Sequence, residues 1–407
     1  MKDYIKLAWR NIWRNKRRTL ITTASIFFAM FLALIMRSGQ VGSYSHMTKS
    51  IVETYSGYIQ IHKNGYWEDK TIDNIFTADN TFISGLDSFE NVKAVIPRLE
   101  SFALASTGNQ TKGVLVIGIN PEKEKGLSNP LKNMCEGNYL SETSNGVLVS
   151  GRLADFLKVE VNDTIVLISQ GYHGVSAAGN FRVEGILKIP NPELDRRIIY
   201  MNLNSAQKLY GAPDMLSSFA INLQNTKLLQ KTVKHLENKL DLNKYEVMSY
   251  KELNPELVQQ IESDQYGGYI MLGLLYMIVG FGVFGTVLMM TAERKREFGV
   301  MVAIGMQKTR LGFIVTLEML FLGLLGIVSG ITGSIPVMLY FYKNPIVFAG
   351  EMAQSFEEFG FEPIMPFAIE SGFIIGQTMV VIVIFAIAIF YPIYSITKLK
   401  EVKALRA

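Results

Sequence analysis

The sequence lacks several features on which enzymatic chemistry or covalent cross-linking usually depends. It holds a single cysteine, Cys135, which excludes an internal disulfide framework. Its four histidines show no H-E-x-x-H motif and no paired metal-ligand spacing; they are His46, His62, His173 and His235. No Gly-Lys dipeptide occurs, so there is no G-x-x-x-x-G-K-[ST] phosphate loop. We therefore expect no metal, no cofactor, no catalytic residue and no nucleotide hydrolysis in this chain.

Four segments lack charge almost completely. Apolar runs cover Leu20–Met36, Tyr269–Met290, Leu311–Tyr342 and Phe373–Ile393, and Glu318 is the one charged residue inside them. A helix crosses the hydrocarbon core of a bilayer with roughly 20 apolar residues, so four transmembrane helices are predicted. The first run follows basic residues, as a signal peptide does. It is longer than a usual signal-peptide core and no A-x-A-like site follows it, which favours a retained anchor.

Lysine and arginine outside these runs predict the orientation. In the short loops and the terminal segments they gather before the first run, between the second and third, and after the fourth, whereas residues 343–372 contain Lys343 alone. By the positive-inside rule, both termini are predicted to be cytoplasmic. These cations also account for the net charge of +4, which does not indicate nucleic acid. The predicted order is a cytoplasmic amphipathic helix (1–18), transmembrane helix 1 (19–41), an extracytoplasmic domain (42–265), transmembrane helix 2 (266–291), a cytoplasmic helix (292–309), transmembrane helix 3 (310–342), an extracytoplasmic loop (343–371), transmembrane helix 4 (372–394) and a cytoplasmic tail (395–407).

The large segment between the first two spans shows alternating strand and helix patterns. Short β-branched runs bounded by turn residues predict strands at 114–119, 146–150, 164–169, 181–189 and 197–201. Helical patterns fall at 152–157, 204–211 and 228–240. The glycine-rich stretch 169–180 is predicted to be a long hairpin loop. The fold class is thus an α-helical membrane protein with four transmembrane helices and a large extracytoplasmic mixed α/β domain between helices 1 and 2.

The N-terminal segment predicts an amphipathic helix. Its apolar face follows the i, i+3, i+4, i+7, i+8 spacing and comprises Ile5, Ala8, Trp9, Ile12 and Trp13. Basic residues at i+4 intervals occupy the opposite side. Such a helix lies in the headgroup plane, with tryptophan at the interface and cations toward anionic lipid. We expect Trp9, Arg10, Trp13 and Arg14 at the membrane surface, and a plain membrane anchor would explain this helix equally well.

The stretch "AERKREFGVMVAIG" (292–305) lies between two apolar runs and contains five consecutive charged residues. After them, Phe298, Val302 and Met306 fall on one helical face, with Gly299 and Gly305 as points of close approach. Glycine inside a helix costs about 1 kcal/mol relative to alanine, so a mere connector would not need two of them. The pattern predicts a short helix that fits a groove on another protein.

This stretch resembles the coupling helix of the FtsX/MacB-type (type VII) ABC permeases, whose pattern is roughly R-x-R-E-[IF]-G-x-x-x-A-[IL]-G. The resemblance assigns contact with an ATPase to Arg294, Arg296, Glu297, Phe298, Gly299, Val302, Ala303, Ile304, Gly305 and Met306. The segment 7–22 resembles the same family's entry to the first span. The closing segment 391–407 matches at Pro392, Ala404, Leu405 and Arg406 but carries Ile396 and Glu401 in place of alanine and proline. Residues 56–67, 116–124 and 146–167 resemble the lipoprotein-releasing (Lol-type) branch.

The resemblance implies a dimer of identical or homologous permeases on a cytoplasmic ABC ATPase dimer, which holds ATP and Mg. Hydrolysis would move the coupling helices and, through them, the extracytoplasmic domains, a process termed mechanotransmission. In the Lol-type branch the cargo is a lipoprotein, extracted from the outer leaflet of the inner membrane and passed to a periplasmic carrier. Two alternatives stay open: an exporter of peptides, antibiotics or other lipidic substrates, and a non-transporting regulator that drives an extracytoplasmic hydrolase or signal.

Three features of the spans bear on this mechanism. Gly326, Gly330 and Gly333 give the third span a small-residue face for close helix packing. Glu318 is interpreted as a structural residue satisfied by neighbouring helices. Adaptable apolar side chains suit a wall that binds acyl chains, although residues that merely face lipid look the same. The candidate wall comprises Phe27, Phe28, Met30, Phe31, Met36, Leu272 and Tyr276.

Overall fold

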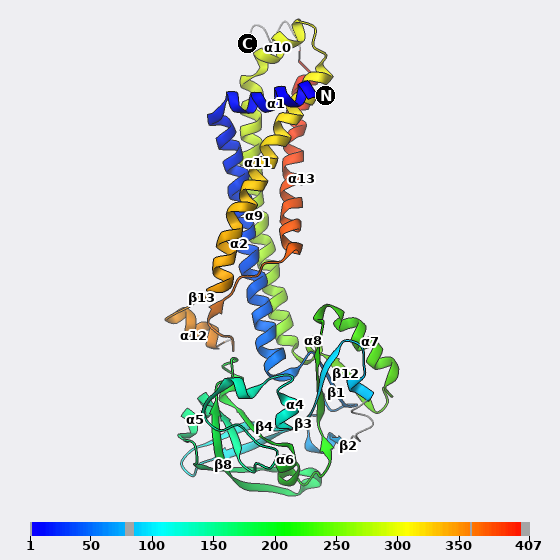
Figure 1. Ribbon diagram of the computed structural model, residues 1–407, viewed down its shortest axis with the longest axis vertical. Helices are drawn as coiled ribbons and strands as arrows, with labels where there is room; N and C mark the ends of the chain where they lie inside the picture. The colour runs from blue at the N-terminus through cyan, green and yellow to red at the C-terminus, as the bar shows by residue number, and fades with distance from the viewer. Residues whose placement is uncertain (1, 78–84, 359, 400–407) are drawn as a thin grey trace. The chain divides into compact units, whose positions relative to one another are not determined.

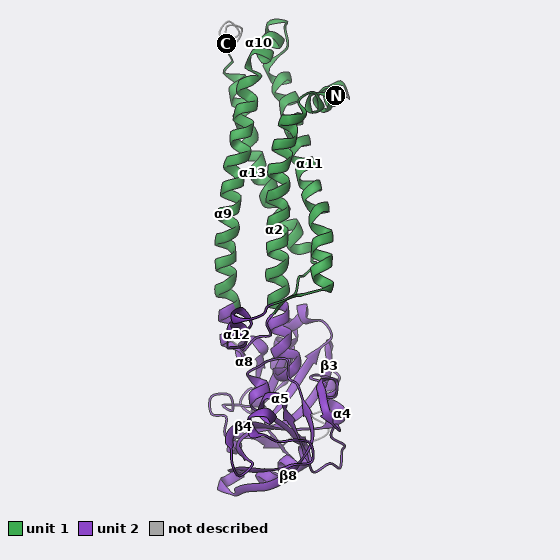
Figure 2. Ribbon diagram, turned by 90° about the vertical axis from the view of Figure 1, so that its left-hand side faces the viewer, with its two compact units in different colours: residues 1–44, 261–347, 364–407 green, residues 45–260, 348–363 purple. Residues whose placement is uncertain are grey.

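The chain forms two compact units. The computed structural model describes residues 2–77, 85–358 and 360–399. The first unit, here called the bundle, comprises residues 1–44, 261–347 and 364–407. The second, here called the β-rich domain, comprises residues 45–260 and 348–363. Figure 2 colours the two units separately.

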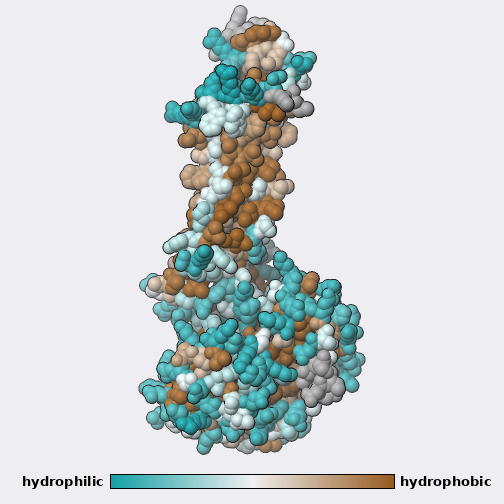
Figure 3. Space-filling model, viewed as in Figure 1, coloured by the Kyte–Doolittle hydropathy of each residue, from teal (hydrophilic) through white to brown (hydrophobic). Residues whose placement is uncertain are grey.

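The bundle is built from long apolar helices. Within the described residues, four helices have the length and composition to cross a membrane, as predicted. They are α2 (Lys16–Ile51), α9 (Pro255–Glu293), α11 (Lys308–Lys343) and α13 (Ser371–Thr397). Figure 3 shows the apolar band on their surface and the hydrophilic side chains at the end that carries two shorter helices. These are α1 (Lys2–Arg14), which runs across the bundle, and α10 (Lys295–Ala303) (Figure 1).

Glycines let α2 and α11 approach closely, which confirms the predicted small-residue face. A Cβ added at Gly326 would lie 2.6 Å from Ile26 Cβ, and one at Gly330 would lie 2.7 Å from Met30 Cβ. Real Cβ atoms do not approach that closely, so any larger residue would push the two helices apart. Because lipid offers no hydrophobic force to hold helices together, such close contact supplies much of their attraction.

The β-rich domain is organised around one mixed sheet of ten strands. Nine of them lie in the order β12-β1-β11-β3-β4-β9-β6-β8-β5, and β7 pairs with β3 and β8. The strands are β1 (Ile59–Lys63), β3 (Val92–Ser106), β4 (Thr111–Ile119), β5 (Met134–Gly137), β6 (Val147–Ser150), β7 (Thr164–Gln170), β8 (Ser176–Leu187), β9 (Ile198–Asn202), β11 (Ser218–Leu223) and β12 (Tyr245–Ser249). Its helices are α4 (Pro121–Glu124), α5 (Gly151–Leu157), α6 (Leu203–Tyr210), α7 (Leu229–Lys239), α8 (Tyr250–Leu253) and α12 (Glu351–Glu358). Two-stranded pairs join β2 (Phe76–Thr77) to β10 (Met215–Leu216) and, in the bundle, β13 (Ile346–Val347) to β14 (Ile364–Met365).

The mixed α/β class is confirmed, but one local prediction is wrong. The stretch 169–180 is not a long loop, because β7 ends at Gln170 and β8 already begins at Ser176. Their register pairs Gln170 with Ser176 and Ser169 with Ala177. Ala177, Ala178 and Gly179 lie in β8, where cross-strand hydrogen bonds outweigh their low strand propensity, and Gly171 and Gly174 lie in the short turn between the strands.

An arginine lies at the centre of this sheet without any exposure. Arg98 of β3 donates to both oxygens of Glu124 in α4, at 3.2 Å from Nε and 2.5 Å from Nη2. Glu124 is also fully buried and accepts from the Ser128 hydroxyl at 2.5 Å. Arg98 further donates to the backbone oxygen of Tyr55. Every charged atom of this pair therefore has a partner in the interior, as a buried ion pair requires.

Candidate coupling site

The loop between α9 and α11 forms a short helix with defined ends. The chain leaves α9 at Glu293, turns at Arg294 and enters α10 at Lys295. At the other end, the amide of Gly305 donates to Val302 O and that of Met306 donates to Met301 O, both at 3.0 Å. These two bonds close the helix in a Schellman motif, which places Gly305 at a φ of +104°. Only glycine adopts that conformation without strain, so its presence follows from the helix end alone.

The two faces of α10 differ from the arrangement that the sequence predicted. Phe298 and Gly299 are buried, and Met301, Val302 and Met306 pack partly buried against the core of the bundle. Of the residues predicted to share the docking face, Phe298 and Val302 lie on the side of α10 that packs on the bundle. Met306 lies beyond the end of α10, so the predicted helical face is shorter than expected. The outward face presents four exposed residues: Arg296, Val300, Ala303 and Ile304. Ile304 has 82% of its surface exposed, the largest fraction of any large apolar side chain among the described residues.

A buried cluster of polar side chains ties α10 to two other helices. Arg294, at the turn before α10, donates through Nη1 to Glu318 Oε2 and through Nη2 to Glu318 Oε1, the latter at 3.3 Å. Asn11 of α1 donates to Glu318 Oε1 at 2.5 Å. Both members of the ion pair are nearly inaccessible to solvent. The interpretation of Glu318 as a residue satisfied by its neighbours is confirmed, and these neighbours are a turn residue and a residue of the crossing helix.

A second, exposed layer extends this cluster. Arg294 Nε also donates to Glu297 of α10 at 3.3 Å. Both carboxylate oxygens of Glu297 accept a hydrogen bond from Arg14 Nη2, each at 2.9 Å. Arg18, in the first turn of α2, pairs with Glu293 at the end of α9. We call Asn11, Arg14, Arg294, Glu297 and Glu318 the junction. It joins α1, α10 and α11 through side chains only, because these helices share no backbone hydrogen bonds there.

The energetics of the junction favour joint movement of its helices. A buried ion pair is balanced against its desolvation, but removing one partner leaves a buried charge, at a cost of about 3–5 kcal/mol. Pulling α10 away from α11 has the same effect as removing a partner, since it separates Arg294 from Glu318. The exposed Arg14–Glu297 pair adds little, because solvent screens it. The arrangement therefore links a displacement of α10 to α11 and α1.

The crossing helix α1 packs more tightly than a simple surface anchor. Ala8 and Ile12 are buried against the bundle, whereas Trp9, Arg10 and Trp13 keep exposed surface. The Trp9 ring lies edge-on to Phe321 of α11 at 5.7 Å and to Trp13 at 6.0 Å. Only part of the predicted apolar face is free to meet lipid.

The residues of the candidate acyl wall do not share one surface. Met30 is fully buried beside Gly330 of α11, and Leu272 of α9 is also buried. Phe27 stacks on Phe31 at 5.5 Å, with both partly buried. Three further residues complete the set: Phe28 is exposed, Met36 is half-buried, and Tyr276 is half-buried and bonded to Gln377. Met30 and Leu272 are therefore closed to an acyl chain in this arrangement, and Phe28 is the most accessible member of the set.

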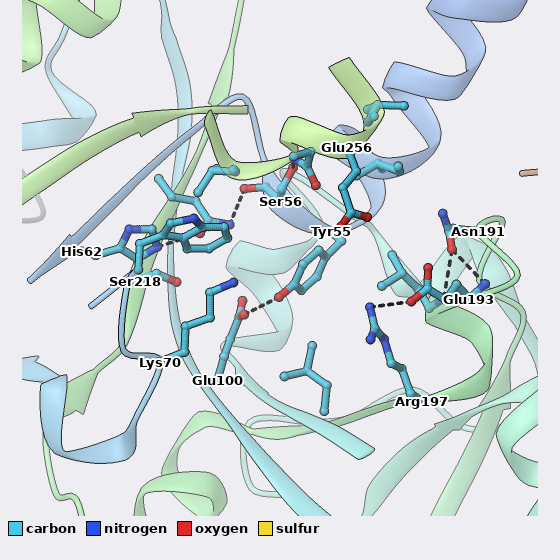
Figure 4. A pocket seen from close by; sticks show the side chains of 18 of the residues that line it. Tyr55, Ser56, His62, Lys70, Glu100, Asn191, Glu193, Arg197, Ser218 and Glu256 are labelled. Carbon is cyan, nitrogen blue, oxygen red and sulfur yellow. Dashed lines mark hydrogen bonds and ion pairs between the residues drawn. The ribbon is translucent and has the colours of Figure 1, made fainter. Parts of the chain in front are cut away.

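The β-rich domain contains a cavity of about 490 Å³ that is lined by both polar and apolar side chains (Figure 4). The Tyr55 hydroxyl donates to Glu100 Oε2 at 2.7 Å inside it. At one side His62 stacks on Trp67, with ring centroids 5.6 Å apart. Burial, together with the nearby cation of Lys70, lowers the pKa of His62 to about 3. The imidazole therefore stays neutral near pH 7 and binds a proton only weakly.

No metal centre is formed by the part of the chain that the structure describes. Nowhere among residues 2–77, 85–358 and 360–399 do three or more His, Cys, Asp or Glu side chains gather as ligands. The tail positions Glu401, Ala404, Leu405 and Arg406, which carry part of the resemblance, lie outside the described residues. Pro392 and Ile396, just before them, are buried within α13.

Comparison with known families decides the membership of the chain. Residues 19–239 match the MacB-like periplasmic core domain, and residues 269–400 match the FtsX-like permease C-terminal domain. The chain belongs to the FtsX/MacB-type ABC permeases. The first match covers more than half of its length, and the second contains α10, α11 and α13.

Individual relatives of this FtsX/MacB-type permease are distant. The pyoverdine export ATP-binding/permease protein PvdT of Pseudomonas syringae pv. syringae is 23% identical over 347 residues, which is 81% of this chain and 50% of that protein. The lipoprotein-releasing system transmembrane protein LolC of Neisseria meningitidis serogroup B is 19% identical over 268 residues, 64% of each chain. The permease thus spans about half the length of the PvdT relatives that it matches. Among solved structures, the periplasmic region of MacB from Actinobacillus actinomycetemcomitans aligns with 14% identity over 53% of this chain and 95% of that one, at a TM-score of 0.35.

Sequence reasoning placed α10 of the permease correctly but missed how it is held. Arg294 was assigned to a partner contact, whereas its side chain turns inward to Glu318. The signal was present, since a lone carboxylate inside an apolar span requires a cation or donors nearby. Nothing in the spacing identifies Asn11, which lies 307 residues away in the sequence.

Proposed function

We propose that this permease transmits the work of a separate cytoplasmic ABC ATPase to its β-rich domain. In this proposal both termini and α10 are cytoplasmic, the β-rich domain is periplasmic, and two permeases, identical or homologous, sit on an ATPase dimer. The observation that carries the proposal is the junction, in which buried bonds from Glu318 reach both α10 and α1. An ATPase that moves α10 would move those helices too.

The docking surface is the outward face of α10. Ile304 and Val300 supply an apolar centre and Arg296 a cation beside it, as in a small interface core with a polar rim. The buried face cannot dock without unpacking the bundle. This assignment replaces Phe298, Val302 and Met306 by Arg296, Val300 and Ile304 as the partner contacts.

The cargo that we propose is a lipoprotein, lifted from the outer leaflet and passed to a periplasmic carrier. The relative named as a lipoprotein-releasing system protein supports this class. So does the broad apolar surface of α9, on which Ile270, Leu274 and Ile278 are exposed. An acyl chain loses about 0.8 kcal/mol for each CH₂ that leaves the bilayer, so the receiving surface must be apolar and reachable from lipid.

A second candidate function is the export of another amphiphilic compound. The relatives named for pyoverdine export support this alternative, since they cover more of the chain than the lipoprotein-releasing relative does. The mechanism of transmission would be the same. Only the cargo and the periplasmic partner would differ.

Photo-crosslinking distinguishes the two cargoes. A crosslinker at Phe28 or Leu274, both exposed, should capture a lipoprotein in the nucleotide-free complex, and ATP should reduce that capture. Phe390 of α13, which is 71% exposed, serves as the matched control and should capture phospholipid only. Capture of a small amphiphile at Phe28, with no lipoprotein, would favour the export function instead. Equal capture at all three positions would contradict both.

A further inference from the structure

A basic cavity of about 770 Å³ lies at the end of the bundle where α1 meets α2. Four basic side chains from one short stretch of the chain line it: Arg14, Lys16, Arg17 and Arg18. One carboxylate, Glu293, faces them from the end of α9. The cavity belongs to neither the outward face of α10 nor the acyl wall.

Two of these cations are not neutralised by the protein. Arg18 pairs with Glu293, and Arg14 pairs with Glu297 at 2.9 Å. Lys16 and Arg17 are exposed, and no carboxylate among the described residues lies within ion-pair distance of either. The mouth of the cavity therefore carries positive charge in excess, and it favours an anion.

The floor of the cavity is apolar and furrowed. Gly282 and Gly285 of α9 leave it open, and a Cβ added at either would meet no atom within 4 Å. Phe281 and Met289 stand on its sides with 71% and 62% of their surface exposed. A furrow of this kind offers water few hydrogen-bond partners, whereas a hydrocarbon chain fills it readily.

We propose that this cavity binds an anionic phospholipid. The phosphate lies against Lys16 and Arg17, and one acyl chain follows the furrow at Gly282 and Gly285. A free phosphate would use only the basic half of the cavity, and a second permease would need only its apolar half. A lipid with an anionic headgroup uses both halves, in the layer where α1 lies.

The basic half is tested by lipid retention. Purified full-length permease is equilibrated with an equal mixture of phosphatidylglycerol and phosphatidylcholine, and the retained lipid is measured by native mass spectrometry. Wild type should retain phosphatidylglycerol preferentially. Each basic side chain near an anionic surface contributes roughly fivefold in affinity, so the double variant Lys16→Gln/Arg17→Gln should weaken that preference roughly 25-fold. Arg310→Gln, an exposed cation at the start of α11 outside the cavity, should leave it unchanged.

The apolar half is tested by filling the furrow. Gly282→Leu should reduce phosphatidylglycerol retention, whereas Gly273→Leu, on the same helix with equally open surroundings but outside the cavity, should not. Equal retention of both lipids by wild type would overturn the proposal. So would displacement of the lipid by millimolar inorganic phosphate, which would identify a soluble anion as the ligand. A loss of dimer without any change in lipid retention, in either cavity variant, would assign the surface to a second permease.

Discussion

Each of the two units contains a buried arginine–glutamate pair, and the two pairs are placed very differently. Arg98 and Glu124 lie inside the β-rich domain, 26 residues apart in sequence, where one strand meets the helix that follows its neighbour. Arg294 and Glu318 join a helix turn to a separate long helix, and Asn11 adds a third helix from the far end of the chain. The first pair stabilises the interior of one domain, where the elements need not move relative to one another. The second pair connects helices that can move relative to one another.

The same kind of buried ion pair thus has different consequences in different surroundings. A pair within one closed sheet affects whether the domain is folded. A pair between helices that meet only through side chains affects whether they move together. Substitutions at the two pairs should therefore give different phenotypes.

Arg98→Met should unfold or strongly destabilise the β-rich domain. It leaves Glu124 buried without a cation, which costs about 3–5 kcal/mol. Hydrogen exchange of the β3 and β4 amides in the full-length protein measures the effect. The double variant Arg98→Met/Glu124→Met should recover much of the loss, because no charge then stays buried. If the single variant exchanges at the wild-type rate, the pair does not hold the sheet.

Ile304→Glu should weaken ATPase binding by about tenfold or more, since it places a carboxylate at the centre of an apolar contact. Copurification with the ATPase measures this. Thr309→Glu supplies the same charge on an exposed residue just beyond α10 and should bind the ATPase nearly as wild type does. A normal yield of complex from Ile304→Glu would show that the outward face of α10 is not the docking surface.

Substitutions at Gly305 test whether this glycine is needed to end α10 or to allow close approach of the ATPase. Its φ of +104° is unfavourable for alanine by about 1 kcal/mol, whereas asparagine tolerates left-handed conformations better. Open space surrounds the position of an added Cβ. Gly305→Asn should therefore retain more coupled activity than Gly305→Ala, although its side chain is larger. The opposite order would mean that the glycine is needed for close approach to the ATPase.

The β-rich domain should lose stability as pH falls, through His62. Its pKa is about 3 in the folded domain, well below the ordinary value of 6.5, so the neutral form is favoured by folding. This contribution is complete above pH 6.5 and is lost as pH falls from 6.5 toward 3, at roughly 1.4 kcal/mol per pH unit within that window. Thermal unfolding across that range should show a shallower slope for His62→Gln than for wild type. The exposed His173→Gln is the control, and a slope equal to that of wild type in both variants would contradict the assignment.

The sequence predicted those parts of the molecule that depend on local pattern. The four long helices, the helix at 295–303 and the glycine contacts of α11 all follow from apolar periodicity and small-residue spacing. Strand β3 was missed, because Lys93, Pro97, Arg98 and Glu100 break its apolar pattern and discourage a strand assignment. In the sheet, Pro97 stands opposite Phe219, and Arg98 is compensated by Glu124. That compensation comes from elsewhere in the chain, and no local pattern contains it.

The orientation of α10 escaped prediction for a related reason. Periodicity showed that Phe298, Val302 and Met306 share a face, but it did not show whether that face meets this protein or another. The answer depends on Arg294, whose bond to Glu318 fixes how the helix is rotated. Arg294 and Glu318 lie 24 residues apart on either side of a turn, so their pairing depends on the tertiary structure and not on a local sequence pattern.

The most direct test of the account is the coupling of ATP to cargo release in Glu318→Gln. Glutamine keeps the size of the side chain and the contact with Asn11, but it removes the counter-charge of Arg294. The account predicts that the variant still copurifies with its ATPase and still hydrolyses ATP. The decrease in cargo capture at Phe28 that ATP causes should be at least tenfold smaller in this variant than in wild type. Arg14→Gln, which breaks only the exposed pair with Glu297, should release cargo almost normally. Normal ATP-driven release by Glu318→Gln, or a failure of that variant to bind the ATPase at all, would contradict the claim that the junction transmits the motion of α10.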